Sequence, residues 1–298
     1  MGIFDRNNPN QNYPNRASGI GPRFIGAIIL AIIAFIMYMS QSQENPVTGE
    51  KQHVSISPAQ EIRLGLESAP AMSQKMGGEL PSSDPRAQRV EKLGQLIVSQ
   101  TAAAKSPWKF RFHLLADTKT VNAFALPGGQ IFITLGLYDK LKTDDQLAGV
   151  LSHEMGHVIE RHSAQQMAKG QLGQLLVSAV AVGASDPQQY GSGQTAAMVA
   201  SVVNQMVQLR YSRTDESQAD IWGLKLMKQS GYDPNALIQV MEILKASGGR
   251  GHTPEIFQSH PNPDLRIEQI KEYLKNTRTK NEPKSPIQPV PVTVPVHD

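Results

Sequence analysis

Two histidines four residues apart, with a glutamate beside them, constrain this chain more than any other feature. His153 and His157 lie in the segment VLSHEMGHVIE, residues 150–160. On an α-helix, residues four apart share one face, so both imidazoles can reach a single metal ion. The Glu154 carboxylate lies beside them, close enough to take a proton from a metal-bound water without being a ligand. The spacing therefore predicts a metal-binding helix that also carries a general base.

The residues around the motif independently predict a helix. Thr143 stands three residues before Gln146, which is the spacing of a capping box. Apolar residues then recur at helical spacing, namely Leu147, Val150, Leu151 and Val158. Two chance histidines on a helix are the alternative interpretation, and the motif needs further ligands to exclude it.

A catalytic zinc ion usually has three protein ligands and one water molecule, so a third ligand is required. His162 lies five residues after His157, which turns it away from the metal face. The pattern with a third histidine would also need glycine and histidine where this chain has Glu160 and Ser163. We therefore interpret His162 as structural.

Glu216 is the better candidate for the third ligand. From Ser212 onward the sequence predicts a helix, on which Glu216 and Asp220 lie four apart on one face. One carboxylate can bind the metal while the other accepts the free N–H of a ligating histidine. Taken alone, the segment favours a solvated acidic helix face, whereas beside the first motif it favours a metal ligand.

Four short segments, spread over about half of the chain, carry a family resemblance. They are NAFALPGG at 122–129, HEMGHVIERH at 153–162, SRTDESQAD at 212–220 and SHPNPDLRI at 259–267. In this order they resemble the HtpX-type and CAAX prenyl endopeptidase family of gluzincin zinc metallopeptidases. The family's multi-span members carry several long apolar segments, whereas this chain shows one, so it is closer to the single-anchor, periplasmic-type branch.

The resemblance implies a ligand set and a fold. It implies His153, His157 and Glu216 as ligands of one Zn²⁺ per chain, Glu154 as the catalytic acid and base, and Asp220 as support for a ligand histidine. The implied fold is α+β, a mainly helical zincin-like metallopeptidase domain with a small β-sheet whose edge strand flanks the active-site helix.

A predicted hairpin supplies that edge strand. The sequence predicts two strands, at residues 121–126 and 130–135, joined by a tight turn at residues 127–129. A polypeptide substrate can add to an exposed strand edge, whose backbone groups pair without reading sequence. The resemblance places this edge at four substrate-binding residues, Asn122, Ala123, Phe124 and Ala125. A plain hairpin is the alternative.

His260 lies between chain-breaking residues, in Ser-His-Pro-Asn-Pro at 259–263, and so belongs to a loop that can be aimed at the metal. The resemblance permits two roles: a catalytic donor to the oxyanion, or an inhibitory fourth ligand in the resting state. Arg213 is a weaker candidate for the oxyanion donor. A surface histidine is the alternative.

The predicted domain organisation has one folded domain. The expected parts are a disordered segment 1–23, a transmembrane anchor 24–40, a polar linker 41–57, the metallopeptidase domain 58–276 and a Pro-rich disordered tail 277–298. Within the domain we expect helices at 58–75 and 85–104, a strand at 110–114, a core helix at 172–183 and a mobile link at 184–195 that could act as a lid.

The expected anchor is the apolar run of residues 24–39. As a helix it spans about 24 Å, slightly short of the ~30 Å hydrocarbon core, so its flanking residues must help. No small-x-small cleavage site follows, which favours an uncleaved anchor over a signal peptide. Arg6, Arg16 and Arg23 precede the run, which predicts a cytoplasmic N-terminus and a periplasmic or otherwise extracytoplasmic catalytic domain.

Composition excludes several other functions. The chain has no cysteine, so metal ligands must be His or carboxylates. The net charge of +3 is carried by scattered basic residues, which does not indicate nucleic-acid binding.

The predicted function is that of a membrane-anchored zinc endopeptidase, and the resemblance suggests misfolded or membrane-associated proteins as substrates. The alternative functions are a non-catalytic, zinc-stabilised membrane protein that holds unfolded clients, and a zinc hydrolase of non-peptide amides. One span cannot enclose a prenyl group, which argues against CAAX processing, and the oligomeric state is not predicted.

Overall fold

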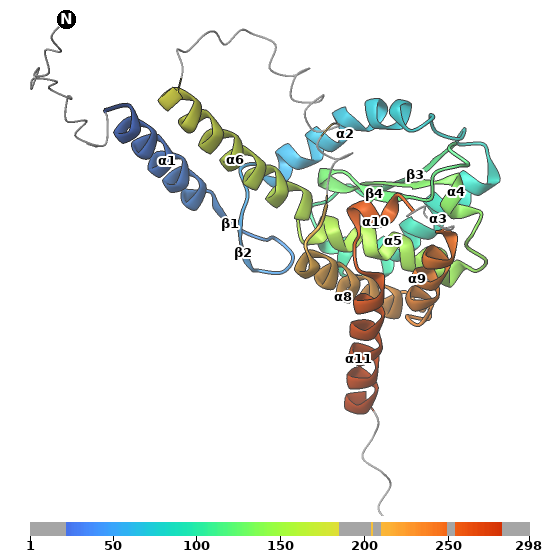
Figure 1. The fold of residues 1–298 in the computed structure, drawn as a ribbon. Coiled ribbons are helices and arrows are strands. Elements are labelled where there is room, and N and C mark those ends of the chain that lie inside the picture. The colour runs from blue at the N-terminus through green and yellow to red at the C-terminus, as the bar shows by residue number, and fades with distance from the viewer. Residues whose placement is uncertain (1–21, 185–203, 205–209, 249–253, 282–298) are drawn as a thin grey trace, which may run out of the picture. The chain divides into compact units, whose positions relative to one another are not determined.

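The computed structural model describes residues 22–184, 204, 210–248 and 254–281 (Figure 1). The predicted disordered segment 1–23, the predicted lid at 184–195 and the predicted tail lie largely outside these residues. Two units are described separately, because residues 1–40 with 170–190 form one and residues 41–169 with 191–298 form the other.

The first unit contains helix α1 (Pro22–Ser40) and the later part of α6 (His162–Ala184). Large apolar side chains are exposed on α1: Ile25, Ile28, Ile29, Leu30, Ile32, Ile33, Phe35, Ile36, Met37 and Met39. In the part of the chain that the structure describes, no helix meets both the length and the hydropathy of a membrane span. Leu175 and Leu176 on α6 are exposed as well, so the prediction of a core helix is wrong for these two residues.

The second unit is a helical domain around a small sheet, which confirms the predicted α+β class. Strands β3 (Arg111–Leu115) and β4 (Ala123–Ala125) flank β5 (Gln130–Thr134) in the order β3-β5-β4. The β3 strand is parallel to β5, and β4 is antiparallel to it with Phe124 opposite Phe132. The β5 strand is buried along its whole length, whereas β4 is an edge strand, as the hairpin pattern predicted.

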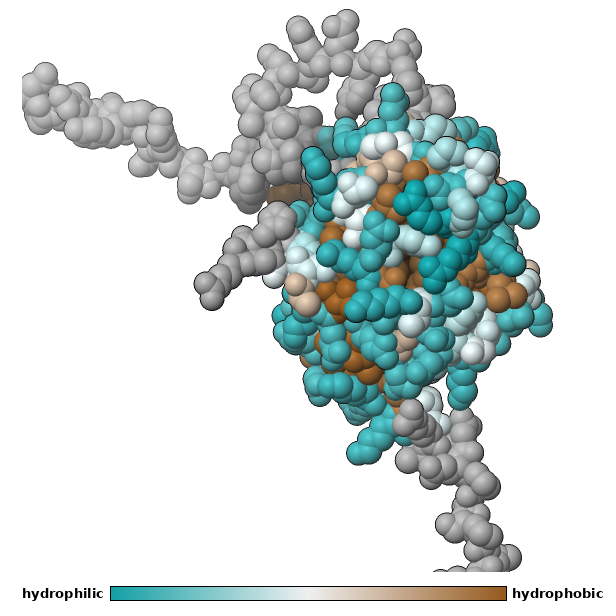
Figure 2. Space-filling model, turned by 90° about the vertical axis from the view of Figure 1, so that its right-hand side faces the viewer, coloured by the Kyte–Doolittle hydropathy of each residue, from teal (hydrophilic) through white to brown (hydrophobic). Residues whose placement is uncertain are grey.

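Helices pack against the sheet and against one another. They are α2 (Pro58–Lys75), α3 (Pro85–Gln100), the short α4 (Leu135–Tyr138), α5 (Asp144–Ile159), α8 (Arg213–Gln229), α9 (Ala236–Ser247), α10 (Ile256–Ser259) and α11 (Pro263–Asn281). Val90, Leu93 and Ile97 of α3 pack in one core with the apolar residues of α5. The face of the domain seen in Figure 2 is mostly hydrophilic with small apolar patches.

Helix α5 is the centre of this domain, because every side chain from Gln146 to Ile159 is buried. Its start agrees with the predicted cap, since the Thr143 side chain accepts from the Gln146 backbone N–H. The reciprocal bond differs from a capping box: the Gln146 side chain accepts from the Lys142 N–H at 2.7 Å. Neighbouring elements cover α5 on several sides, which is why its apolar residues extend beyond a single stripe.

The predicted linker at 41–57 is instead an ordered hairpin. Strands β1 (Ser42–Glu44) and β2 (Lys51–His53) are antiparallel. Asn45 Nδ2 donates to the Ile159 carbonyl at 2.8 Å, and Gln52 Nε2 donates to the Glu160 carbonyl at 3.0 Å. The last carbonyls of a helix have no partner within it, so buried polar side chains of the hairpin satisfy the end of α5. No local sequence pattern indicates these long-range contacts, so the sequence analysis predicted a linker instead of a hairpin.

Two helix boundaries and the exposure of one residue also differ from the predictions. The helix expected at 85–104 ends at Gln100 and is followed by a 3₁₀ turn at Ala102–Lys105. Leu96, whose spacing places it on the same helix face as the buried Leu93 and Ile97, is 41% exposed. Helix α11 continues to Asn281, past the predicted start of the tail at 277.

A buried arginine closes α5 at the turn into α6. Arg161 adopts a left-handed backbone conformation with φ 58° and is 1% exposed. Its Nε donates to Glu61 Oε1 on α2 at 2.8 Å, and its Nη2 donates to the Ile56 carbonyl at 2.9 Å. Such a conformation is unfavourable for a residue with a side chain, so these contacts hold the turn. Burial raises the pKa of the Glu61 carboxyl from its ordinary 4.5 to about 7, although Arg161 lowers it.

The Glu61 shift predicts a pH dependence of stability. Because the folded-state pKa lies above the unfolded value, the contribution is fully present below about pH 4.5 and is lost as the pH rises through about 7. We expect Glu61→Gln to flatten the pH dependence of the free energy of unfolding in this range, measured by urea denaturation of the metal-free chain. Glu67→Gln, an exposed change on the same helix, should not. An unchanged slope in Glu61→Gln would contradict the shift.

Candidate metal centre

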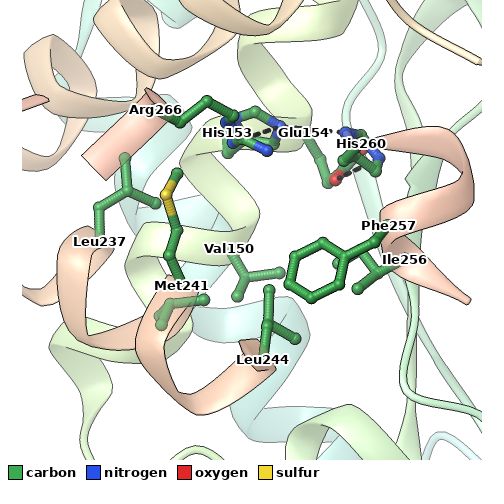
Figure 3. A pocket seen from close by; sticks show the side chains of 11 residues that line it. Val150, His153, Glu154, Leu237, Met241, Leu244, Ile256, Phe257, His260 and Arg266 are labelled. Atoms are coloured by element: carbon green, nitrogen blue, oxygen red, sulfur yellow. Dashed lines mark hydrogen bonds and ion pairs between the residues drawn. The ribbon is translucent and has the colours of Figure 1, made fainter. Parts of the chain in front are cut away.

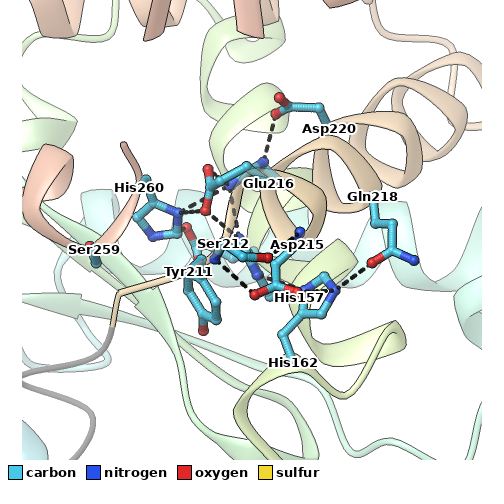
Figure 4. A network of polar contacts seen from close by, with 12 residues as sticks. His157, His162, Tyr211, Ser212, Asp215, Glu216, Gln218, Asp220, Ser259 and His260 are labelled. Carbon is cyan, nitrogen blue, oxygen red and sulfur yellow. Dashed lines mark hydrogen bonds and ion pairs between the residues drawn. The ribbon is translucent and has the colours of Figure 1, made fainter. Parts of the chain in front are cut away.

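Four buried side chains from three regions of the chain converge on one point (Figure 4). His153 and His157 come from α5 and Glu216 comes from α8, whereas His260 directly follows α10 as its C-cap residue. One nitrogen or oxygen atom from each lies within 4.8 Å of the others, which is close enough for all four to hold a metal ion. The structure therefore brings the three predicted ligands together and adds His260 to the group.

Close packing of α5 against α8 produces this convergence. A Cβ atom at Gly156 would lie 2.7 Å from the Ala219 carbonyl oxygen, so only glycine permits the approach. The α5 backbone also runs close to Gly223, where a Cβ atom would lie 3.4 Å from the His153 nitrogen. With the helix backbones this near, side chains as short as His and Glu can meet between them.

The outer nitrogens of both α5 histidines are already engaged. Asp220 Oδ1 lies 2.9 Å from His153 Nδ1, the contact expected of a supporting carboxylate. His157 Nδ1 lies 2.9 Å from His162 Nδ1. The two Nε2 atoms then face each other at 3.1 Å inside the group. When Nδ1 carries the proton, Nε2 presents a lone pair, so the two facing nitrogens suit a cation.

His162 therefore contacts the group that we expected it to turn away from. The prediction assumed that α5 continues past His157 with helical geometry, but the chain turns at the left-handed Arg161. That turn returns His162 to the Nδ1 of His157. His162 is not among the four side chains that converge.

Glu154 lies beside the group as a buried carboxylate. It is 1% exposed, and His260 Nε2 approaches its Oε1 at 3.6 Å. Within the described residues, neither Glu154 oxygen has a hydrogen-bond partner. Burial raises the pKa of the Glu154 carboxyl, which makes it a better proton acceptor. A buried carboxylate without a hydrogen bond suits a group that exchanges protons with a bound molecule.

Arg266 of α11 is the site residue that the sequence reading gave no role. Its guanidinium contacts Glu216 Oε2 and Asp220 Oδ1, both at 2.6 Å, and it is 7% exposed. Burial opposes ionisation of Asp220, but Arg266 outweighs it and brings the Asp220 pKa down to about 2. The only sequence signal was the place of Arg266 in a family segment, which does not reveal its partners.

Tyr211 is a second residue without a predicted role. Its ring stacks on His157 with centroids 3.8 Å apart, and its backbone N–H donates to the Ser259 carbonyl at 2.9 Å. It therefore contacts one side chain of the converging group and holds the segment that carries another, His260. Arg213, the weaker predicted oxyanion donor, is exposed in the first turn of α8.

An apolar pocket opens beside the group (Figure 3). It is a small hollow that is partly open to solvent. Glu154, His153, His260 and Arg266 lie on one side. The remaining lining is apolar and consists of Val150, Leu237, Val240, Met241, Leu244, Ile256 and Phe257. The polar side chains of the group and an apolar surface are therefore adjacent.

Comparison with known proteins identifies the family. The model of peptidase family M48 matches residues 84–274, well over half of the chain and all of the centre described above. The chain belongs to peptidase family M48. This confirms the resemblance, and with it the predicted enzyme class: the protein is a metallopeptidase, and its substrates are polypeptides.

Curated relatives of this M48 peptidase include two differently named enzymes. It is 29% identical over 249 residues to mitochondrial metalloendopeptidase OMA1 of Schizosaccharomyces pombe, covering 83% of this chain and 71% of that protein. It is 28% identical over 229 residues to the beta-barrel assembly-enhancing protease of Escherichia coli, covering 74% of this chain but 45% of that protein. The chain thus matches less than half of the length of the bacterial relative.

The edge strand of the M48 domain lies along the catalytic helix (Figure 1). Ala123 and Ala125 of β4 are buried, and Phe124 between them is half-buried and stacks on Phe132. At the start of the strand, the Val121 carbonyl accepts from the Ile256 N–H at 3.4 Å. The predicted substrate edge and the segment leading to His260 are therefore neighbours.

Arg266→Met should show how strongly the site depends on its buried cation. Leaving Glu216 and Asp220 without this partner is expected to cost ~3–5 kcal/mol of unfolding free energy in the metal-free chain. A bound divalent cation should restore part of the loss, because it neutralises Glu216. Lys271→Met removes an exposed cation of the same helix and should change stability by at most ~1 kcal/mol. Equal effects of the two substitutions in denaturant titrations would contradict this account.

Proposed function

We propose that this M48 peptidase is a membrane-anchored, zinc-dependent endopeptidase with His153, His157 and Glu216 as metal ligands. The observation that carries the metal site is the pair of Nε2 atoms facing each other at 3.1 Å while both Nδ1 atoms are engaged elsewhere. Imidazole and carboxylate ligands on three positions are the donor set of a catalytic zinc site. The residues present therefore fit the ion.

Zinc, when bound, supplies a Lewis acid that polarises the scissile carbonyl and acidifies a water molecule. Glu154 takes the proton of the attacking water and returns it to the leaving amine. Asp220 holds the His153 ring through its Nδ1, and Arg266 keeps the carboxylates of Asp220 and Glu216 ionised. The buried position of Glu154 keeps competing water away from this proton transfer.

The substrate lies in an extended conformation along β4, at Asn122, Ala123, Phe124 and Ala125. The edge position of β4 supports this, since an edge strand offers backbone groups to an added strand. The apolar lining of the pocket beside Glu154 favours contact with an apolar side chain of the substrate. Apolar side chains are accessible in unfolded chains, which supports misfolded or membrane-associated proteins as substrates.

His260 is a fourth ligand in the resting site rather than only an oxyanion donor. Its Nδ1 lies 3.0 Å from Glu216 Oε1 and 3.3 Å from His153 Nε2, inside the ligand group. Its Nε2 faces Glu154. In this position His260 occupies space that water and substrate need, so its departure would open the site.

The main alternative is a zinc-stabilised protein that holds clients without cleaving them. Glu154 argues against it, because a buried carboxylate without a hydrogen-bond partner among the described residues lowers stability and has no use in a holding protein. A hydrolase of non-peptide amides is disfavoured by the family, whose members are peptidases.

The first test is cleavage of casein by the purified full-length chain loaded with zinc. We expect Glu154→Gln to retain stoichiometric zinc and to lose activity by at least ~10²-fold, because general-base catalysis is removed. Asp144→Asn, an exposed carboxylate change on the same helix, should retain activity. Full activity of Glu154→Gln would disprove the mechanism, and binding of casein without cleavage by the zinc-loaded wild type would favour the holding protein.

The same assay distinguishes the two roles of His260. If His260→Ala cleaves casein faster than the wild type, His260 is a ligand of the resting site. If the variant cleaves casein more slowly, His260 is the oxyanion donor.

The α1 helix is the proposed membrane anchor. Its ten exposed large apolar side chains support this, because water does not favour such a surface and a bilayer does. We expect the full-length chain to float with phospholipid vesicles after an alkaline wash. Replacing Ile29 and Ile33 by Lys should abolish flotation, since a cation at a helix centre costs about 3 kcal/mol in a membrane. Replacing Leu66 and Leu96, exposed on α2 and α3, by Lys should not. Flotation of the Ile29/Ile33 variant would exclude the anchor.

A further inference from the structure

The two α5 histidines are supported by different chemistry on their outer sides. A metal-ligating imidazole must present an unprotonated nitrogen to the ion, and the partner of its other nitrogen selects the tautomer. For His153 that partner is a carboxylate, Asp220, at 2.9 Å. For His157 it is a second imidazole, His162, at 2.9 Å. An imidazole can donate or accept, so it selects a tautomer only if its own proton is placed.

The contacts of His162 indicate which of its two ring nitrogens carries the hydrogen (Figure 4). His162 Nε2 lies 3.1 Å from Gln218 Oε1 and 3.9 Å from Asp215 Oδ1. Both atoms are acceptors, so Nε2 of His162 carries the hydrogen. Nδ1 of a neutral His162 is then an acceptor, and the 2.9 Å contact requires His157 Nδ1 to donate. His157 Nε2 is left with its lone pair directed into the ligand group.

We propose that His162 and Gln218 are positioning residues that fix the tautomer of His157 through two consecutive hydrogen bonds. This relay rests on the proposed metal site, in which neither residue is a ligand. It gives each α5 histidine its own support, a charged one for His153 through Asp220 and a neutral one for His157 through His162 and Gln218.

The opposite orientation of the relay is incompatible with metal binding. If the Gln218 amide donated to His162 Nε2, the His162 proton would move to Nδ1 and be donated to His157 Nδ1. His157 would then carry its hydrogen on Nε2, which points into the ligand group 3.1 Å from His153 Nε2. A protonated nitrogen cannot bind the ion. Zinc binding and the observed contacts therefore select the same arrangement of protons.

The fold holds both members of the relay and the ring they support. Arg161, anchored by Glu61, turns the chain so that the 1% exposed His162 meets His157. Gln218 follows Glu216 by two residues on α8, so one helix supplies a ligand and the end of the relay. Tyr211 stacks on the face of His157 at 3.8 Å, which leaves the ring little freedom to rotate.

The experiment measures zinc affinity of the full-length chain by competition with a chelator at fixed pH. Loss of the outer partner of a ligating histidine costs roughly 10- to 100-fold in affinity. We expect such a loss for His162→Phe, which keeps the ring volume, and a loss of about 10-fold for Gln218→Leu. Gln218→Glu keeps an acceptor oxygen opposite His162 Nε2 and should bind zinc at least as tightly as the wild type.

Matched controls separate the relay from general effects on α8. Gln229 lies on the same helix and is exposed, and its side-chain oxygen accepts from the Ala102 N–H, remote from the ligand group. Gln229→Leu and Gln229→Glu should leave zinc affinity within about twofold of the wild type, well below the losses expected for the relay. Thermal unfolding of the metal-free variants shows whether each one is folded. Because Gln218 is half-buried, its substitution by Leu keeps the test informative even if His162→Phe does not fold.

A second readout follows the protons directly. In ¹⁵N-histidine-labelled wild type loaded with zinc, NMR should show hydrogen on Nδ1 of His157 and on Nε2 of His162. Hydrogen on Nδ1 of His162, or unchanged zinc affinity in both folded variants, would overturn the relay while leaving the metal site intact. Failure of the wild type to bind zinc would instead overturn the proposed function, so the two hypotheses fail by different observations.

Discussion

The close contact between α5 and α8 is the constraint on which the rest of this structure depends. Gly156 removes the side chain that would otherwise meet the Ala219 carbonyl, and the two backbones approach until their polar side chains meet. Pairs four residues apart on each helix then face each other: His153 and His157 from one, Glu216 and Asp220 from the other. A single close contact thus places two imidazoles and two carboxylates in a dry interior, which water would not favour without compensation.

Compensation comes from hydrogen bonds and from one buried cation. Arg266 of α11 reaches Glu216 and Asp220 together, and its guanidinium is well suited to two carboxylates because its donors lie in a rigid plane. Glu154 has no such hydrogen-bond partner within the described residues. The groups that orient ligands are therefore paired, whereas the group that would transfer protons is not, a difference expected of a catalytic site.

Contacts from distant segments also stabilise the C-terminal end of α5. The β1–β2 hairpin satisfies its last carbonyls through Asn45 and Gln52, and Arg161 turns the chain while bound to Glu61. These contacts come from residues about one hundred positions away in sequence. Their consequence is local, because the turn places His162 against His157 and so defines the surroundings of the metal site.

Local patterns in the sequence predicted helices α2, α3, α5 and α8 and the hairpin of β4 and β5, and helical spacing put His153 and His157 on one face of α5. Glu216 became a candidate only beside that motif and through the family resemblance. What the tertiary structure decided are the partners of these side chains. A left-handed arginine, a hairpin that caps a helix and a cation on a third helix all depend on segments far apart in sequence, and no spacing rule relates them. The sequence therefore specified which polar side chains the chain carries, whereas packing determined which atoms each of them contacts, since hydrogen bonds depend on distances that only the folded chain defines.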